Sequence, residues 1–445
     1  MNDSFDPRCY GAVADGHTKD TAAVQAAIDA AAAQGGTVRL AGGIFVCGTL
    51  YLKSNVALEI TNSATLLASP DIADYGTDTH HNRYRNEPEL DRCFLFAQDA
   101  ENVTVCGSGV IDGNAAAFPN AGSIYRPMLL RVLRRRNVRV QGLRLLNAAA
   151  WTTAFLDSDF IWATDLHIEN HSNYNGDGLD FDGCRHVWVR GCYIDGTDDN
   201  LCLQSSGLPV QDVHISDCAF TSVCAGIRIG LKSIGEISNV VISNCTMRNI
   251  WREGIKLECT EGGSITDVLV ENVTMHNVRR PIFAILNNRY RPDDLGSSVE
   301  LDHMPPIGTM ARLRFAGITA VDDEEMANTQ RRFDNDVMGE PRFGGCRFDA
   351  NANHPIKDVM IRDFWYTAIG GVRLADLPST PYPEVPDRLL DPAAPASENY
   401  YPDWSRTTHL DVRNVQGLVR ENLHFETLHP DERPKMLAES STDMF

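Results

Sequence analysis

A short strand-like motif recurs along the chain about every 26 residues, and this repeat restricts the possible folds most strongly. Each copy is a first, mostly polar residue followed by an alternating apolar pattern. The clearest copies are Asn102–Val105, Asn137–Val140, Phe160–Ala163, His186–Val189, Asp212–Ile215, Asn239–Ile242 and Asp267–Val270. From Val138 onward their second residues are 23, 26, 26, 27 and 28 positions apart. Short strands at this period, without helices between them, predict an all-β solenoid, whereas a propeller blade needs about 40 residues.

The repeat predicts one domain over residues 1–445. Residues 7–60 are expected to form an N-terminal cap, because the helix-like run Ala22–Ala33 precedes the strands. Such a cap protects the open edge of a solenoid from pairing with another chain. The solenoid coils are predicted over residues 95–430. Asn at the first position of a copy fits a tight corner, because Asn tolerates left-handed backbone.

Long polar stretches interrupt the repeat. The insertions at 289–345 and 374–405 contain runs rich in Pro, Asp and Glu, which indicate surface loops. We expect these loops to wall a cleft, with a subunit contact as the alternative. Residues 76–92 are also interpreted as a loop. Sugar binding is the alternative there, because this stretch carries His80, His81, Arg83, Tyr84 and Arg85.

Composition excludes several classes of function. The formal net charge of −20 disfavours binding to nucleic acid or to an anionic membrane. No apolar run of about 18 residues predicts a membrane span. The start, Met1–Asp6, shows no signal peptide, so we expect a cytoplasmic protein, or a secreted one if a leader has been removed. The twelve cysteines show no metal-ligand spacing, and no metal or cofactor is predicted.

Two acidic turns are the strongest chemical signal. Asp177 precedes a short apolar strand, and Asp198 and Asp199 precede another, 21 positions later. Coils of about that length would stack the turns on neighbouring strands, about 4.7–4.9 Å apart. Asp is common in turns, but three crowded carboxylates raise the proton affinity of at least one of them. A protonated carboxyl group beside an ionised one is the arrangement that glycoside hydrolases use.

Several segments resemble those of the polygalacturonase-like glycoside hydrolases, family 28, which degrade pectin. The similar segments are Tyr10–Gly16, Gly109–Gly113, Arg126–Pro127 and Asn147–Trp151, together with Asn175-Gly176-Asp177 for the family's N-x-D motif and Asp198-Asp199 for its D-D pair. The resemblance implies a right-handed parallel β-helix. It also implies that Asp198 is the general acid, that Asp177 and Asp199 hold the attacking water, that Asn175 contacts substrate, and that the reaction inverts the anomeric centre.

Two further family motifs are altered. The family histidine is replaced by Ala225, and the R-x-K pair that grips a uronate carboxylate aligns with Lys256 and Glu258. Arg228 is a new cation on the neighbouring coil. We take Arg228, Lys256 and Glu258 as substrate-binding candidates, and structural salt bridges with the acids are the equal alternative for Arg228 and Lys256. The altered R-x-K pair predicts weak activity on unmodified polygalacturonate and a preference for a less anionic glycan. The alternative is that Arg228 and Lys256 together restore a two-cation clamp on the uronate carboxylate.

The expected partner is an oligo- or polysaccharide, and the sequence does not predict an oligomeric state. Two other functions stay open. A polysaccharide lyase or epimerase on the same fold would abstract a proton beside a uronate carboxylate. A non-catalytic carbohydrate-binding solenoid is the third reading, although a scaffold has no reason to concentrate repelling carboxylates.

Overall fold

The computed structural model describes residues 4–79, 90–118, 125–289, 306–328, 343–386, 402 and 404–443. The chain divides into two compact units. Unit 1 comprises 1–198, 213–218 and 293–296, and unit 2 comprises 199–212, 219–292 and 297–445. Within the described ranges, nearly all regular structure is β-strand in parallel pairing.

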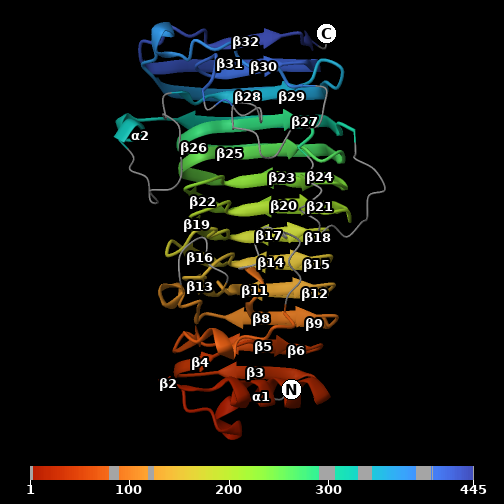
Figure 1. Ribbon diagram of the computed structural model, residues 1–445, viewed down its shortest axis with the longest axis vertical. Coiled ribbons are helices and arrows are strands. Elements are labelled where there is room, and N and C mark those ends of the chain that lie inside the picture. Colours follow the sequence, from red (N-terminus) through yellow and green to blue (C-terminus); the bar gives the residue numbers. More distant parts are fainter. Residues whose placement is uncertain are drawn as a thin grey trace. The chain divides into compact units, whose positions relative to one another are not determined.

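Unit 1 is a parallel β-helix with three strands per coil. Its strands are β1 (Ser4–Phe5), β2 (Asp15–Lys19), β3 (Gly36–Leu40), β4 (Gly43–Cys47), β5 (Leu50–Leu52), β6 (Val56–Ile60), β7 (Ala64–Ala68), β8 (Cys93–Gln98), β9 (Glu101–Gly107), β10 (Val110–Asp112), β11 (Met128–Leu133), β12 (Arg136–Gln141), β13 (Arg144–Leu146), β14 (Thr153–Leu156), β15 (Asp159–Thr164), β16 (His167–Asn170), β17 (Leu179–Asp182), β18 (Arg185–Arg190) and β19 (Tyr193–Gly196). Every third strand pairs, as in β8–β11–β14–β17, which Figure 1 shows as a stack. The predicted solenoid is therefore confirmed.

The first residue of each repeat copy lies at a left-handed corner. Asn55, Asn102 and Asn137 have φ of 59°, 55° and 59°. Their amides form a ladder, in which Asn102 Nδ2 donates to Asn55 Oδ1 at 2.8 Å and Asn137 Nδ2 donates to Asn102 Oδ1 at 2.9 Å. Phe160 and His186 occupy the same corner on later coils, and their rings stack 4.4 Å apart. The predicted role of Asn at the corner is confirmed.

The apolar residues of the repeat point into the coils. Val138, Ile161 and Val187 are buried and lie opposite one another on consecutive strands. Helix α1 (Thr21–Gln34) buries a face that includes Val24 and Ile28, so the predicted N-terminal capping helix is confirmed. Strand pairing already begins at β1, which pairs with β3 inside the segment predicted as cap.

Unit 2 is built from longer strands in the same parallel pattern. They are β20 (Leu201–Ser205), β22 (Ala219–Ser222), β23 (Ile227–Ser233), β24 (Glu236–Ser243), β25 (Thr246–Cys259), β26 (Ser264–Leu286), β27 (Thr309–Val321), β28 (Cys346–Ala350), β29 (Ile356–Gly370), β30 (Leu410–Arg413), β31 (Val415–His429), β32 (Met436–Glu439) and β33 (Thr442–Asp443). Strand β21 (Val210–Ser216) contributes residues to both units. Core positions continue in register through Val268, Leu313, Val359 and Leu418.

The predicted insertions are only partly described. Within 289–345, β27 continues the register of the coils, and helix α2 (Glu324–Asn328) follows it. Within 374–405, residues 374–386, 402 and 404 are described. The sugar-binding alternative for His80, His81, Arg83, Tyr84 and Arg85 falls outside the described residues.

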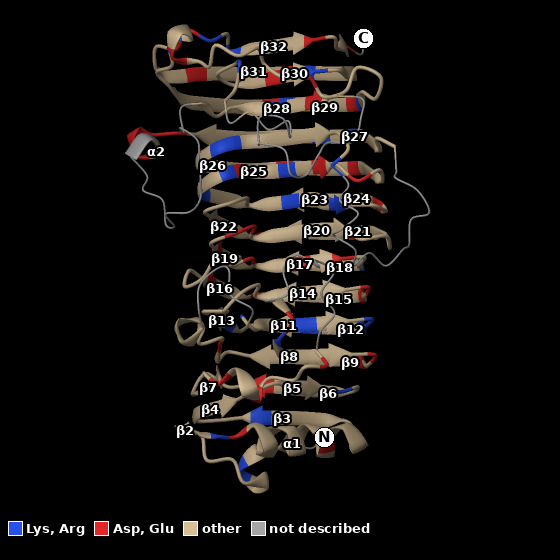
Figure 2. Ribbon diagram, in the orientation of Figure 1, with Lys and Arg blue, Asp and Glu red and all other residues tan. Residues whose placement is uncertain are grey.

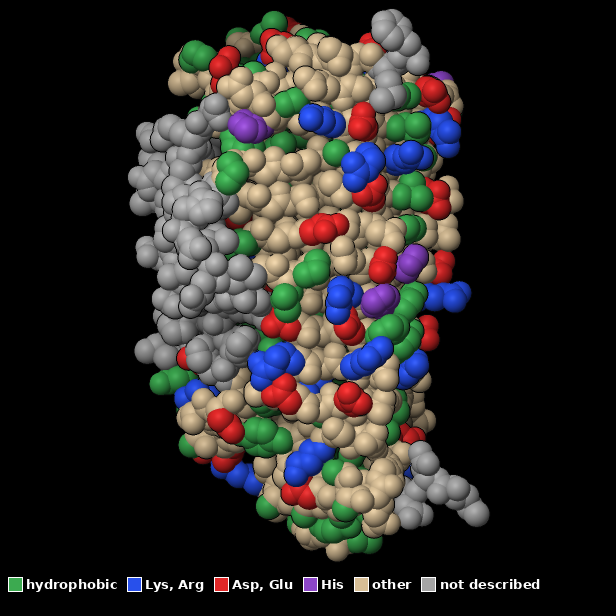
Figure 3. Space-filling model, turned by 90° about the vertical axis from the view of Figure 1, so that its right-hand side faces the viewer, with side chains coloured by type: hydrophobic (Ala, Val, Ile, Leu, Met, Phe, Trp, Pro, Cys, Tyr) green, Lys and Arg blue, Asp and Glu red, His purple; other side chains and the backbone are tan. Residues whose placement is uncertain are grey.

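Charge is spread over the surface. The described residues on the face in Figure 3 carry basic and acidic side chains interspersed rather than gathered by sign. Neither α1 nor α2, the two α-helices in the described ranges, has the length and apolar character that a membrane span requires. Among the described residues, the twelve cysteines form no disulfide, and most are buried, as expected for thiols that pack as small apolar groups.

Candidate active site

In unit 1, the two predicted acidic turns are hydrogen-bonded to each other. Gly176 N donates to Thr197 Oγ1 at 2.9 Å, and Thr197 Oγ1 donates to Asn173 O at 2.7 Å. A Cβ on Gly176 would lie 2.3 Å from Thr197 Oγ1, so only glycine permits this approach. The turns that carry Asp177 and Asp198 are thus stacked as the 21-residue spacing predicted.

Asn175 connects the two turns through its amide. Its Nδ2 donates to Asp198 Oδ2 at 3.5 Å, and its Oδ1 accepts from Arg126 Nη2 at 2.8 Å. Arg126 is buried, and its other terminal nitrogen donates to Tyr174 O. Arg126 therefore fixes the orientation of the Asn175 amide. This positioning role was missed in the sequence, where Arg126 appeared only within a family-like segment.

The two acids of unit 1 differ in exposure. Asp177 is buried, and its backbone oxygen accepts from Thr152 N at 2.9 Å. Asp198 is half-buried at the end of its turn. A half-buried carboxyl beside an amide donor can reach a ligand, as a proton donor to substrate must.

In unit 2, Asp199 is a buried carboxylate held by the chain. It is 1% exposed, its Oδ1 accepts from Ala225 N at 3.1 Å, and its Oδ2 accepts from Arg228 Nη1 at 2.6 Å. Burial alone would raise the pKa of Asp199, but the charges of Arg228 and Lys256 outweigh burial and lower that pKa to about 2. Asp199 is therefore ionised at near-neutral pH.

The remaining sequence candidates meet in one charge cluster around Arg228. Arg228 on β23 lies opposite Lys256 on β25, so the neighbouring-coil prediction is confirmed. Arg228 Nε lies 2.7 Å from Glu258, and Lys256 Nζ lies 3.6 Å from the same carboxylate. Figure 2 shows basic positions on both β23 and β25, which are neighbours in the stack.

A second acid, Glu253, extends the cluster and was not found from the sequence. It lies 3.3 Å from Lys256 Nζ and 3.1 Å from Arg280 Nη1. Burial opposes ionisation of Glu253, but the cations around it, Lys256 first, hold its pKa well below the usual range. Each carboxylate of the cluster, namely Asp199, Glu253 and Glu258, already has an Arg or Lys partner.

Exposure decides which cations can meet a ligand. Lys256 is only 3% exposed, whereas Arg228 is 20% exposed. Arg252 is 45% exposed, with Nε 3.7 Å from Glu253 and Nη1 3.7 Å from Cys224 Sγ. Arg252 adds an accessible cation that the sequence reading passed over. Its neighbour Trp251 is buried and packs against Val223.

Comparison with known proteins identifies the family. Residues 48–299, more than half of the chain, match the family model described as glycosyl hydrolases family 28. The chain belongs to glycosyl hydrolases family 28. The resemblance that rested on the N-x-D and D-D motifs is thereby confirmed.

The curated relatives of this family 28 chain are distant. The exo-poly-alpha-D-galacturonosidase of Dickeya chrysanthemi is 25% identical over 243 residues, 43% of this chain and 40% of the relative. A probable polygalacturonase of Vitis vinifera is 26% identical over 262 residues, 52% of each chain. The matched stretch thus spans about half, or less, of these relatives.

Solved structures share the fold. An exopolygalacturonase from Thermotoga maritima aligns with a TM-score of 0.65 and 22% identity, covering 82% of this chain and 87% of that one. A polygalacturonase from Erwinia carotovora aligns with a TM-score of 0.63 and 20% identity, covering 82% and 94%. The family 28 chain is accordingly a right-handed parallel β-helix.

Proposed function

We propose that this family 28 chain hydrolyses an α-linked galacturonan of pectin. Asp198 is the general acid that protonates the leaving oxygen, and Asp177 and Asp199 hold the attacking water. The stacked turns of unit 1, the family motifs and the polygalacturonase names of the relatives support this proposal.

The observation that carries the proposal is the state of Asp199. A buried carboxylate is expensive unless it is paired, and this one is paired with Arg228 and stays ionised. A permanently ionised carboxylate can bind and orient water but has no proton to deliver. Glycoside hydrolysis needs one carboxyl protonated and another ionised, so Asp199 is not the acid. We assign that role to the half-buried Asp198 rather than to the buried Asp177, because the donor must reach the substrate.

The reaction follows as a single displacement. Asp198 gives its proton to the glycosidic oxygen while water, oriented by the other two acids, attacks the opposite face of the sugar. Inversion of this kind requires an acid–base separation of about 6.5–9.5 Å, which leaves room for the water. That separation stays a prediction for this protein.

The accessible cations favour an acidic glycan. Among the described residues, none accepts a hydrogen bond from Arg228 Nη2, so this nitrogen is available for a substrate carboxylate. Arg252 offers a second exposed guanidinium beside Glu253. Guanidinium groups match the geometry of carboxylates. We therefore favour the alternative in which Arg228 restores the clamp, with Arg252 rather than the buried Lys256 as its partner.

A substrate panel tests the proposal. Initial rates of reducing-end release are measured on polygalacturonate and on neutral or rhamnose-containing oligosaccharides. The proposal expects the fastest release from polygalacturonate. Faster release from the neutral oligosaccharides would favour the original expectation drawn from Lys256 and Glu258, and no release from any would favour the binding solenoid.

Removing the exposed cation should weaken substrate binding. Arg252→Ala is expected to raise KM for polygalacturonate about 10- to 100-fold, the value of a charge-assisted hydrogen bond, with kcat changed little. Arg248→Ala, an exposed arginine of the same strand, is the control. An equal rise in KM on a neutral oligosaccharide would show that Arg252 does not bind the substrate carboxylate.

The face that carries Arg228 is covered farther along unit 2. By register, Lys256 lies opposite Phe283, Phe283 opposite Arg347, and Arg347 opposite Asp411. Val385 packs on Phe283 and Ile285 within a buried apolar cluster. The segment around Val385 therefore covers this face. For the described residues, this supports the prediction that the insertion at 374–405 walls a cleft.

The covering segment, residues 381–386, is held in place by arginines beneath it. The Tyr382 ring lies 5.1 Å from Arg347 and 5.2 Å from Arg413. Arg413 Nη2 donates to Pro383 O at 2.6 Å, and Arg347 Nη2 donates to Trp404 O at 2.6 Å. A glycan lying along this face would be stopped at β26. We infer that the protein works from chain ends, as the names of two relatives indicate for those proteins.

Chain-end action predicts a distinctive time course. During early digestion of polygalacturonate, one short product should dominate while viscosity falls slowly, because internal bonds are untouched. Product sizes by chromatography and viscosity are followed together. A rapid fall in viscosity, with a ladder of medium-length products, would contradict the stop formed by residues 381–386.

A further inference from the structure

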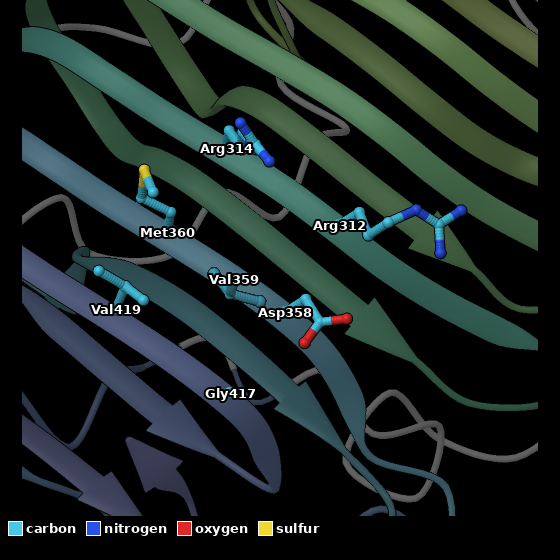
Figure 4. Close-up of a pocket in the computed structure, with 7 residues that line it drawn as sticks. All are labelled: Arg312, Arg314, Asp358, Val359, Met360, Gly417 and Val419. Atoms are coloured by element: carbon cyan, nitrogen blue, oxygen red, sulfur yellow. The ribbon is translucent and has the colours of Figure 1, made fainter. Parts of the chain in front are cut away.

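A hollow of about 290 Å³ lies on the sheet formed by β27, β29 and β31 of unit 2. It is lined by Arg312, Arg314, Asp358, Val359, Met360, Gly417 and Val419, and Figure 4 shows them on these neighbouring strands. None of these residues belongs to the charge cluster around Arg228. The hollow is therefore a separate feature of unit 2.

The hollow exists because one residue in a column of left-handed corner residues has no side chain. Asp267, Arg312, Asp358 and Gly417 follow one another at the left-handed corner, with φ of 57°, 56°, 54° and 71°. Arg312 Nε and Nη2 donate to the Asp267 carboxylate at 2.6 and 2.7 Å. Gly417 has no side chain to place next to Asp358, and the space is left open.

The wall of the hollow combines one open cation with an apolar surface. Arg314, Met360 and Val419 lie opposite one another on the three strands. Arg314 is exposed, and within the described ranges its guanidinium has no hydrogen-bond or ion-pair partner. Met360 and Val419 are half-buried. A ligand here meets a guanidinium, a carboxylate acceptor at Asp358 and an apolar floor.

We propose that this hollow is a second, non-catalytic binding site for one or two uronate residues of a pectic chain. The inference rests on the proposed function for its ligand class. The sugar carboxylate pairs with Arg314, hydroxyl groups donate to Asp358, and the C–H face of the ring packs on Met360 and Val419. The volume of the hollow lies just below the usual range of small-molecule sites, which starts at about 300 Å³.

Charge complementarity selects the uronate over other ligands. Arg312 is already neutralised by Asp267, so the hollow presents one available positive charge and one available acceptor. A neutral sugar would leave Arg314 unused. A uronate supplies a carboxylate and hydroxyls together, and a polyuronate repeats them along its length. Binding at two sites of one chain raises the effective concentration of polymer at the protein without changing the chemistry.

The test uses the Asp198→Asn variant, so that the ligand is not consumed. Methionine methyl groups are labelled with ¹³C, and the Met360 resonance, assigned by Met360→Leu, is followed during titration with a trimer of galacturonate. We expect a saturable shift of this resonance. Adding Arg314→Ala should weaken the interaction at least about tenfold, and Arg248→Ala should leave it unchanged.

A second variant fills the space directly. Gly417→Asn restores the corner residue that the ladder uses at Asn102 and Asn137, where Asn adopts the same left-handed backbone. It should abolish the Met360 shift while the protein stays folded, even if Arg314→Ala does not fold.

Three outcomes would overturn the proposal. They are no Met360 shift, an equal shift with a neutral trisaccharide, and a stronger shift with an acidic peptide of the same charge. Because the readout needs no turnover, it is independent of whether polygalacturonate is hydrolysed. A protein that binds the trimer at the hollow but cleaves nothing would refute only the proposed function.

Discussion

Replacing Asp198 by Asn is expected to lower kcat on polygalacturonate by about 10²–10⁴-fold, the usual contribution of a general acid. Asn has nearly the same shape but no proton of suitable acidity to give to the leaving oxygen. It keeps an oxygen that can accept from Asn175 Nδ2, so the stacked turns of unit 1 should remain. Steady-state rates of reducing-end release, with circular dichroism as a check of folding, measure the effect.

A control variant shows whether the rate falls because the proton donor is missing or because any acidic residue of unit 1 has been removed. Asp165→Asn changes an exposed corner residue of unit 1, where Asn tolerates the same left-handed φ of 54°. Its rate should match the unmodified protein. On a substrate with a good leaving group, Asp198→Asn should recover much of its rate. Near-normal rates with a poor leaving group would remove Asp198 from the acid role.

Arg228→Met should cost about 3–5 kcal/mol of the free energy of unfolding, because it leaves Asp199 and Glu258 buried with one cation fewer. It should also raise the pKa of Asp199, which Arg228 and Lys256 now hold at about 2. Because that folded pKa is lowered, the stability that Asp199 contributes is present above its unfolded pKa. It is lost only as pH falls toward about 2.

In the variant, this contribution should be smaller and its loss should be complete at a higher pH, and activity should fall first on the acid side of the profile. Urea denaturation and a pH–rate profile measure both effects. Arg185→Met is the matched control, since Arg185 pairs with Asp159 at 2.9 Å on the surface, where such pairs contribute about 0–1 kcal/mol. Equal losses in the two variants would show that the buried cluster has no special stability or electrostatic role.

Much of the fold followed from local pattern. The period of the apolar residues and the left-handed corner at Asn102 and Asn137 are properties of single coils, so the sequence displays them directly. The stacking of the Asp177 and Asp198 turns followed from their spacing. The facing of Arg228 and Lys256 followed as well, because 28 positions is one coil.

The partners within the charge cluster could not be read in the same way. Glu253 reaches Lys256 and Arg280 because the pairing of β25 with β26 shifts register between Ile250 and Glu253. The repeat does not reveal such a shift. The closeness of Tyr382 to Arg347 depends on how an insertion without a period folds back. Contacts of that kind come from tertiary packing, which a single sequence does not display.

The configuration of the first-formed product tests the central claim most directly. Digestion of polygalacturonate is followed by ¹H NMR from the first minutes, before mutarotation mixes the anomers, and near-ultraviolet absorbance is recorded in parallel. In the proposed mechanism, Asp198 protonates the leaving oxygen while Asp177 and Asp199 hold the attacking water. Because this reaction inverts the α-linkage, it predicts a β-configured new reducing end and no rise in absorbance. An α-configured first product, or an unsaturated product that absorbs in the near ultraviolet, would contradict it.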